Sequence, residues 1–226
     1  MVMDFDFTLL GEVPAPKSFM VRREFRGVGS FKLTVQRDAG GLLARDRVIY
    51  RPDRPGQGWI IHRVSRSGDT LTVDGTPLKG LAKRRICLPP LITGGAYNQF
   101  GYDLFTGDAE SAYLHFAANN LTAPEDAARA IPHLVLDTNL HRGPELPWQA
   151  RFEKLSDLFE DIGAATEVGW DIRPDFGAKR YVFGAWAGVD RTTGTGRCAL
   201  SRELGNVEGG SVTEDAGSAV TVVYAG

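Results

Sequence analysis

The sequence predicts an α+β protein that is mainly β: a small antiparallel β-barrel interrupted by an inserted α+β domain. Three observations carry this prediction. Short alternating segments fill residues 19–95, helical periodicity enters only after residue 96, and strand-like sequence returns at residue 197. We therefore expect a barrel domain made of residues 1–95 plus 197–226, and an inserted α+β domain made of residues 96–196.

The clearest strand of the barrel is residues 30–36, where Phe31, Leu33 and Val35 alternate with polar residues. A period of two places one face on a core and the other in water. Gly68 supplies the positive φ that a tight hairpin turn needs at residues 66–69. Further strands are expected at 19–25, 47–51, 59–65 and 70–74.

A short helix is expected at residues 76–83, with Thr76 as its N-cap and Pro77 at its first helical position. Such a helix would close one end of the barrel. An extended run follows at residues 84–88 and stops at the two prolines after it.

Helical patterns mark the inserted domain. Asp108 is the expected N-cap of a helix that runs to about Leu121. A second helix is expected from Phe152 to about Val168, because its apolar residues form a stripe at helical spacing. Gly169 fits the left-handed position that often ends a helix.

Strands are expected on either side of the second helix and at the C-terminal end. The expected segments are 131–136, a hairpin of 170–173 and 180–186 turning at 174–177, and two strands at 197–201 and 218–224. The last two would complete the barrel. Because the chain ends inside a strand pattern, a barrel-closing strand and a longer protein both fit.

Composition excludes some classes of function. The formal net charge of −2 gives no bulk attraction to phosphate or to an anionic membrane, so nucleic-acid sequence recognition is not expected. The N-terminus lacks a basic leader, and apolar runs are far shorter than the ~20 residues of a membrane-spanning helix. We expect a protein made and kept in the cytoplasm until assembly.

Candidate chemistry is sparse, and we expect no catalytic, cofactor-binding or metal-binding residue and no cofactor. His133 and His141 flank a loop with Asp137 and could meet at a metal, which is the less favoured reading. His62 falls in an alternating strand, which favours a solvent-facing or barrel-wall position. Cys198 lies in an apolar alternation, which favours burial in a core.

Two further motifs have plain structural readings. The segment 193–197 resembles a phosphate loop but lacks its lysine and following helix, so a hairpin turn is expected. The carboxylate pairs Asp171 with Asp175 and Glu160 with Asp161 show no sign of a buried partner, so a solvated surface is expected.

Arginines give the first domain a local basic excess. We interpret them as an interface that could meet the acidic helix at residues 153–167, since arginine is enriched in protein contacts. A merely soluble charged surface fits equally well. The residues are Arg22, Arg23, Arg26, Arg45, Arg47, Arg51, Arg54, Arg63 and Arg66.

Several segments in order resemble the tail hub or minor tail proteins of long-tailed phages and prophages, the baseplate hub-like family. No single segment is diagnostic, so the resemblance depends on their order and spacing. The segments are 29–35, 59–64, 71–81, 84–86, 109–112, 151–155, 169–172, 188–192 and 203–207.

The resemblance implies a structural subunit and no enzyme. It implies a trimeric ring at the tail tip of the virion, assembled in the host bacterial cytoplasm, that continues the tail tube. Its partners would be distal tail, tape-measure, tail fibre or tip proteins. Two alternatives stay open: a tail-associated peptidase or glycan hydrolase using His133, His141 or Asp137, and a carbohydrate-binding adhesion module. The four tryptophans that suggest the module are Trp59, Trp148, Trp170 and Trp186.

Overall fold

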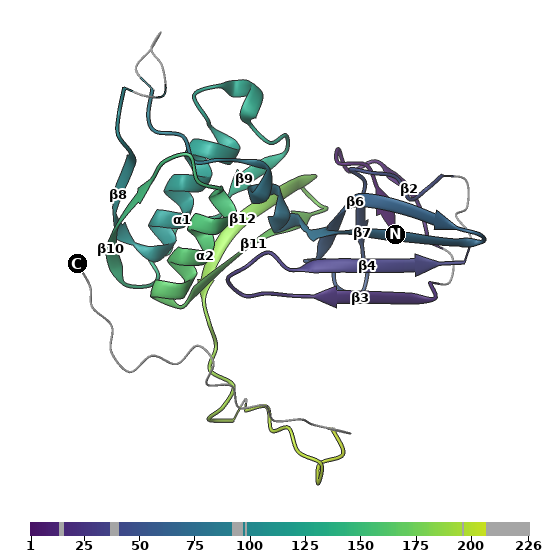
Figure 1. Ribbon diagram of the computed structural model, residues 1–226. Coiled ribbons are helices and arrows are strands. Elements are labelled where there is room, and N and C mark those ends of the chain that lie inside the picture. The colour runs from purple at the N-terminus through teal and green to yellow at the C-terminus, as the bar shows by residue number, and fades with distance from the viewer. Residues whose placement is uncertain (14–15, 37–40, 92–96, 98, 196, 207–226) are drawn as a thin grey trace, which may run out of the picture. The chain divides into compact units, whose positions relative to one another are not determined.

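The computed structural model describes residues 1–13, 16–36, 41–91, 97, 99–195 and 197–206 (Figure 1). The chain divides into two units, residues 1–188 and residues from 189 onward. All helices and strands among the described residues belong to the first unit. None of those helices is long and apolar enough to cross a lipid bilayer.

The first part of the chain folds into a curled half-barrel sheet of seven antiparallel strands in the order β2-β1-β5-β6-β7-β4-β3 (Figure 1). Its strands are β1 (Val2–Met3), β2 (Leu9–Gly11), β3 (Ser18–Arg22), β4 (Ser30–Val35), β5 (Val48–Tyr50), β6 (Gly58–Ser67) and β7 (Thr70–Pro77). The predicted α+β, mainly β class is confirmed. Among the described residues the sheet is open, with β2 and β3 at its edges.

The inner face of the half-barrel is apolar, as the alternation predicts. Phe31, Leu33 and Val35 of β4 are buried together with Trp59 of β6 and Val73 of β7. The β6–β7 hairpin turns at Gly68, whose φ of 54° is the predicted positive value. This core fixes the register of β4 against β7, since a slip by one residue would turn the apolar set outward.

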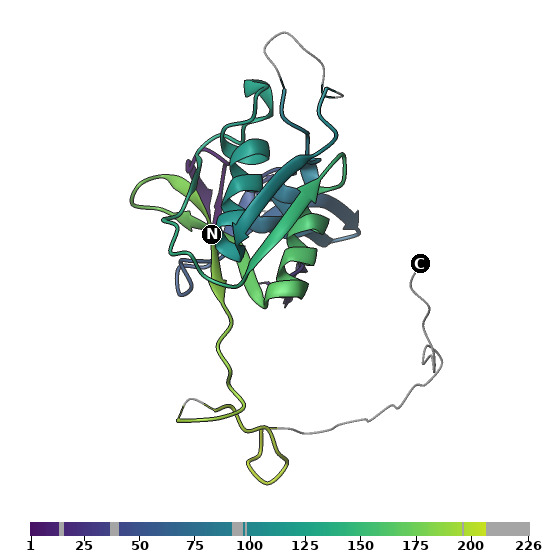
Figure 2. The same ribbon diagram turned by 90° about the vertical axis from the view of Figure 1, so that its left-hand side faces the viewer.

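The second part of the first unit is α+β. It contains the 3₁₀ helix η1 (Leu78–Arg84), β8 (Asp103–Asp108), α1 (Ala109–Ala117), the π-helical turn η2 (Ala118–Thr122), the 3₁₀ turn η3 (Ala127–Arg129), β9 (Leu134–Leu136), β10 (Glu145–Ala150), α2 (Leu155–Thr166), β11 (Val168–Asp175) and β12 (Arg180–Ala187). Strand β12 pairs with β11 and, in parallel, with β9, whereas β8 and β10 form a separate ribbon. Figure 2 shows this ribbon in front of the helices.

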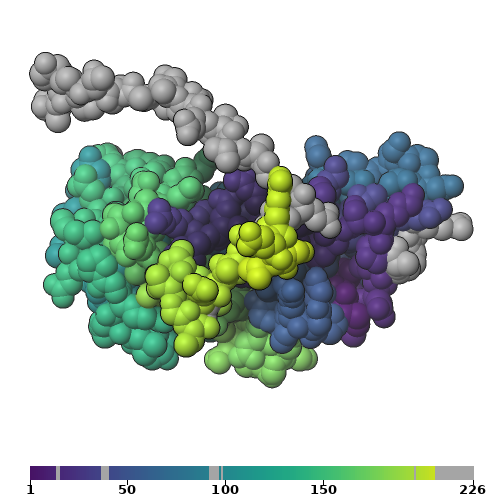
Figure 3. All heavy atoms as spheres, turned by 90° about the horizontal axis from the view of Figure 1, so that it is seen from below, coloured from purple at the N-terminus to yellow at the C-terminus, as the bar shows by residue number. Residues whose placement is uncertain are grey.

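One apolar core runs from the half-barrel into the α+β part. Ile60 of β6 and Leu78 of η1 belong to the same buried cluster as Tyr113 of α1 and Phe159 of α2. Figure 3 shows the purple atoms of the first strands beside the green atoms of the helical part. The α+β part therefore shares its core with the sheet that precedes it.

The predicted helix from Phe152 to Val168 is shorter at both ends. Phe152 has a left-handed φ of 58°, and its N–H donates to the Cys87 carbonyl, which keeps this segment out of the helix. Glu167, with φ of 58°, takes the left-handed position predicted for Gly169. Gly169 instead lies in β11, where a Cβ would come within 2.4 Å of the Phe25 ring.

Of three other boundaries, one agrees with prediction and two differ. Asp108 is the predicted N-cap of α1 and accepts from the Ser111 N–H. The helix expected at Thr76 starts only at Leu78, because β7 continues through Pro77. Strand β9 begins at Leu134, since His133 has a φ of 61° that no strand accommodates.

The strand predicted at residues 197–201 is wrong, because this segment has no regular secondary structure and a turn follows it at residues 202–205. The Asn206 side chain donates to the Ala199 carbonyl and accepts from the Ser201 N–H, at 2.8 and 2.9 Å. These bonds occupy backbone groups that a ladder would use. The strand predicted at residues 218–224 lies outside the described residues.

Candidate assembly interface

Strand β3 is an unpaired edge of the half-barrel with apolar side chains in solvent. It hydrogen-bonds to β4 on one side, and no other described strand pairs with it. Met20 is 62% exposed, whereas Phe19 packs inward against the half-barrel core. An edge strand of this kind presents a row of free N–H and C=O groups to another chain.

The opposite edge is short. Strand β2 has three residues, and the ladder between β1 and β2 shifts register between Val2 and Met3. Leu9, at the start of β2, is 55% exposed. Short strands and irregular ladders limit pairing at an edge, so the two edges of this sheet are unequal.

The β3–β4 connection anchors the half-barrel to the α+β part. Residues 23–29 leave β3 and reach β11, where the Trp170 indole Nε1–H donates to the Arg26 carbonyl at 2.6 Å. Gly29 returns the chain to β4 with a φ of 76°, and a Cβ there would come within 2.3 Å of the Arg22 carbonyl oxygen. Only glycine fits that position.

A half-open cavity of about 250 Å³ lies under this connection. Its lining includes Glu24 and Phe25 of the connection, Lys79 of η1, and Trp170 and Asp171 of β11. Lys79 is 3% exposed, and its ammonium donates to the Glu24 carbonyl at 3.1 Å. The same ammonium lies 4.4 Å from the Trp170 ring centre, a cation–π distance.

Burial governs the titration of both charged groups in the cavity. Burial lowers the pKa of Lys79 to about 8, against the opposing attraction of Asp171 and Glu24. Burial also raises the pKa of Asp171, against the attraction of Lys79 and Arg23. Asp171 is partly buried rather than fully solvated as predicted, because β11 places its side chain under the β3–β4 connection.

Perturbed pKa values often mark catalytic sites, but here they accompany a structural anchor. The Lys79 nitrogen is held by the Glu24 and Phe25 carbonyls and by the Trp170 ring. The two carbonyl contacts join η1 to the β3–β4 connection of the half-barrel, and the ring contact joins η1 to β11. The arrangement fixes the base of the β3 edge relative to the α+β part.

The structure does not bring together the residues of the predicted alternative metal site. Asp137 pairs with Arg173 at 2.8 Å, while His141 Nδ1 lies 3.0 Å from an Asp108 carboxylate oxygen. Across the described residues, no group of three potential ligands gathers at metal-binding distance. His133 holds a left-handed turn before β9.

The remaining predicted residues fall in ordinary positions. His62 is exposed, as predicted, and its Nε2 lies 2.9 Å from the Thr76 hydroxyl. Cys198 is exposed, so its predicted burial in a core is wrong. The described residues around it, 197–206, are almost all exposed as well and form no apolar core of their own. Cys87 is buried, and its thiol pKa is raised to about 12 by burial.

Several predicted interface arginines pair within the chain. The pairs are Arg22 with Glu24, Arg47 with Asp4, Arg51 with Asp53 and Arg63 with Asp74. All four are at least partly exposed, so each adds little stability and can rearrange when a partner binds. Asp175 pairs with Arg180 at 3.1 Å on the surface, and Glu160 and Asp161 are exposed on α2, as predicted.

The tryptophans do not form an exposed platform. Trp59 and Trp170 are 2% and 1% exposed and belong to cores. Trp148 and Trp186 are partly buried, and the Trp186 ring lies 5.7 Å from the Arg173 guanidinium. This arrangement gives no support to the carbohydrate-binding alternative.

Sequence reasoning missed two charged features. Glu110 is 1% exposed and holds Arg142 through two side-chain bonds of 2.9 and 2.7 Å. Lys79 is the second, since its side chain is buried and its ammonium lies over the Trp170 ring. Both residues stand in helical segments among apolar neighbours, which is the only sequence signal that could have indicated their burial.

A half-barrel sheet that shares its core with an α+β part is similar to the fold of one solved prophage tail protein. The prophage tail protein gp18 from Listeria monocytogenes EGD-e has this fold, with a TM-score of 0.50 and 12% identity over 80% of this chain and 49% of its own. The Escherichia coli c3393 protein, a type VI secretion component similar to T4 tail proteins gp27 and gp5, gives a TM-score of 0.41 at 10% identity, over 74% of this chain and 44% of its own. This chain thus spans about half the length of these structures.

The sequence model of the siphovirus ReqiPepy6 Gp37-like protein family matches residues 1–226, and the chain belongs to this family. The predicted resemblance to tail proteins of long-tailed phages and prophages is confirmed. No curated protein sequence matches the chain.

Proposed function

We propose that this chain is a structural subunit of the phage tail tip, where three copies form a ring that continues the tail tube. The ring docks distal tail, tape-measure, tail fibre or tip proteins, and the chain carries no catalytic role. Assembly takes place in the bacterial cytoplasm, and the product resides in the virion.

The observation that carries this proposal is the open β3 edge. A ring with three-fold symmetry needs a head-to-tail contact, in which one surface of a copy meets a different surface of the next. The half-barrel offers two unequal edges, β3 and β2, at opposite ends of one sheet. Pairing of β3 with the neighbouring sheet would bury the exposed side chains of Met20 and Val21.

Family membership and the shared fold support the same assignment. The anchor at Lys79 adds to it, because a strand edge that joins subunits must be held at a fixed orientation. The sequence predicted that residues 197–226 return to the first sheet. Residues 197–206 form no strand, so we propose this return for residues 207–226 alone.

The test is the assembly state of a variant with a charged edge. We expect Met20→Lys to reduce association of the chain in sedimentation velocity by at least about tenfold, since lysine on an edge strand opposes pairing. Leu104→Lys is the matched control, because Leu104 is 68% exposed but lies on the separate β8–β10 ribbon. Equal association of the two variants would argue against the β3 edge as the contact.

A further inference from the structure

A groove lined by basic side chains lies where η1, η3 and the start of α2 meet. Its cavity volume is about 320 Å³, and none of its described lining residues is a carboxylate. The cationic residues of this basic groove are Lys83, Arg84, Arg85, Arg129 and Lys154. One sign of charge concentrated in a concave site attracts anionic groups of a partner.

The fold holds the groove in place without neutralising it. The Arg85 Nε–H donates to the Arg129 carbonyl and the Arg129 guanidinium to the Ile86 carbonyl, both at 2.8 Å. Carbonyl acceptors carry no formal charge. Burial lowers the pKa of Arg85, and the positive charges of Arg129 and Arg84 lower it further, so the cations repel one another.

Little in the described chain compensates this charge. Arg84 pairs with Asp46 at 2.8 Å, and within the described ranges it is the one groove cation with an ion pair. Lys83 and Lys154 are exposed at the groove. The groove therefore offers two lysines and two fixed guanidinium groups to an anionic partner.

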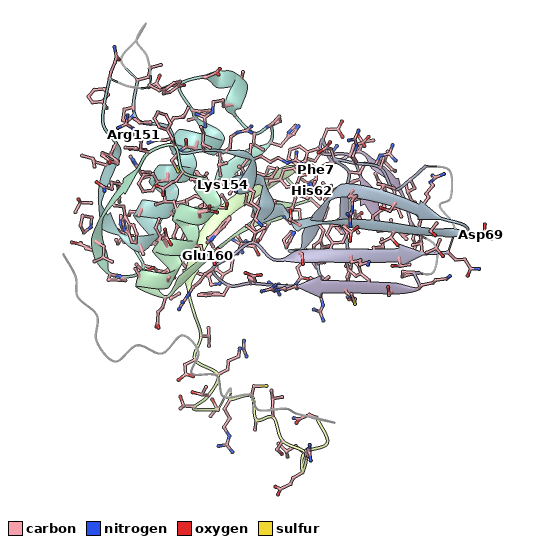
Figure 4. The ribbon with its side chains drawn as sticks, in the orientation of Figure 1. Phe7, His62, Asp69, Arg151, Lys154 and Glu160 are labelled. Carbon is pink, nitrogen blue, oxygen red and sulfur yellow. The ribbon has the colours of Figure 1, made fainter. Side chains whose placement is uncertain are left out.

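An acidic face lies on α2. Asp157, Glu160 and Asp161 are exposed on one side of it, with Glu160 and Asp161 three and four residues after Asp157. The pKa of the nearby Glu153 is raised by burial and then by the charges of Asp161 and Asp157, so these carboxylates also repel one another. Figure 4 labels Lys154 and Glu160 at separate points along this segment.

We propose that the basic groove of one copy binds the acidic face of α2 on a second copy. The inference rests on the proposed function, because it names a contact between the copies of the assembly. Each chain carries one groove and one acidic face, so every contact relieves two self-repelling surfaces at once. With a net charge of −2, the chain as a whole gives no comparable attraction for a polyanion such as nucleic acid.

Charge reversal on each surface tests this contact. Lys83→Glu with Lys154→Glu reverses the groove, and Glu160→Lys with Asp161→Lys reverses the acidic face. All four side chains are exposed, so we expect each variant to fold with an unchanged circular dichroism spectrum. In sedimentation velocity, each reversal should weaken self-association by at least about tenfold. The quadruple variant should restore it.

The outcomes separate this contact from the β3 edge. Lys179→Glu, which reverses an exposed charge in the turn between β11 and β12, is the control and should associate as the unaltered chain does. If the double reversals leave association unchanged while Met20→Lys abolishes it, the groove contact is wrong and the proposed function stands. A chain that stays monomeric at every concentration contradicts both. Binding of a labelled single-stranded oligonucleotide that the groove reversal abolishes, with self-association intact, also overturns the proposal.

Discussion

The ammonium of Lys79 lies 4.4 Å from the centre of the Trp170 ring, and both residues are buried where the half-barrel meets the α+β part. Around this contact the Trp170 indole and the Lys79 ammonium donate to three successive carbonyls of the β3–β4 connection, those of Glu24, Phe25 and Arg26. A surface edge strand is thereby tied to the core of the molecule.

The first prediction concerns the pH dependence of stability at Lys79. Its pKa is about 8 in the folded chain against 10.5 for the free side chain, so the unfolded state binds more protons between these values. The free energy of unfolding should therefore rise by about 2 kcal/mol as pH increases from 8 to 10.5. Lys79→Met should lack this rise. Urea titrations of both proteins measure it, and parallel pH profiles would contradict the burial of a charged amine.

The second prediction concerns Asp171, where the change of the unfolding free energy with pH has the opposite sign. The pKa of Asp171 is raised by burial, so the folded state binds more protons than the unfolded state just above pH 3.8. The free energy of unfolding should fall as pH rises through the interval between 3.8 and the folded pKa. Asp171→Asn should remove this decrease, and the difference between the two unfolding profiles checks it. A difference that does not vary with pH would place Asp171 in solvent.

The third prediction concerns the ion pair between the buried Glu110 and the partly exposed Arg142. Because the carboxylate is 1% exposed, Glu110→Ala leaves Arg142 without its partner and should cost about 2 to 4 kcal/mol of unfolding free energy. Arg63→Ala, which breaks the exposed pair with Asp74, is the control and should cost less than about 1 kcal/mol. Equal losses of unfolding free energy in the two variants, measured by urea unfolding, would show that the burial of Glu110 does not strengthen its pair with Arg142.

The fourth prediction compares two indole groups. Trp170 Nε1 donates to the Arg26 carbonyl, whereas the buried Trp148 Nε1 has no partner among the described residues. Trp170→Phe should cost roughly 1 kcal/mol more than Trp148→Phe, since only the first leaves a carbonyl unpaired. Thermal unfolding followed by circular dichroism measures the difference. A larger loss for Trp148→Phe would mean that its N–H has a partner in solution.

Sequence patterns predicted the parts of the fold that rest on local periodicity. The alternation of Phe31, Leu33 and Val35, the Gly68 turn and the Asp108 N-cap are confirmed. Helix and strand ends were less predictable, because contacts distant in sequence decide them. The Cys87 carbonyl, 65 residues earlier in the chain, accepts from the Phe152 N–H and keeps Phe152 out of α2. Gly169 lies so close to the Phe25 ring that no side chain fits there.

The charged features of the candidate interface could not be predicted from local sequence. Lys79 and Asp171 are far apart in the chain, and only the fold brings them into one cavity, under the β3–β4 connection. The basic groove likewise gathers residues from η1, η3 and the start of α2. Local periodicity indicates which face of an element is polar, but it does not show which polar faces meet.

The central claim is that copies of this chain pair through the β3 edge, and hydrogen–deuterium exchange at different protein concentrations tests it most directly. Outward N–H groups of β3 should exchange freely in dilute protein and become protected as the chain associates. The β6–β7 turn at Asp69, labelled at the tip of the hairpin in Figure 4, is the internal control and should not change. Association without any gain of protection in residues 18–22 would contradict the account.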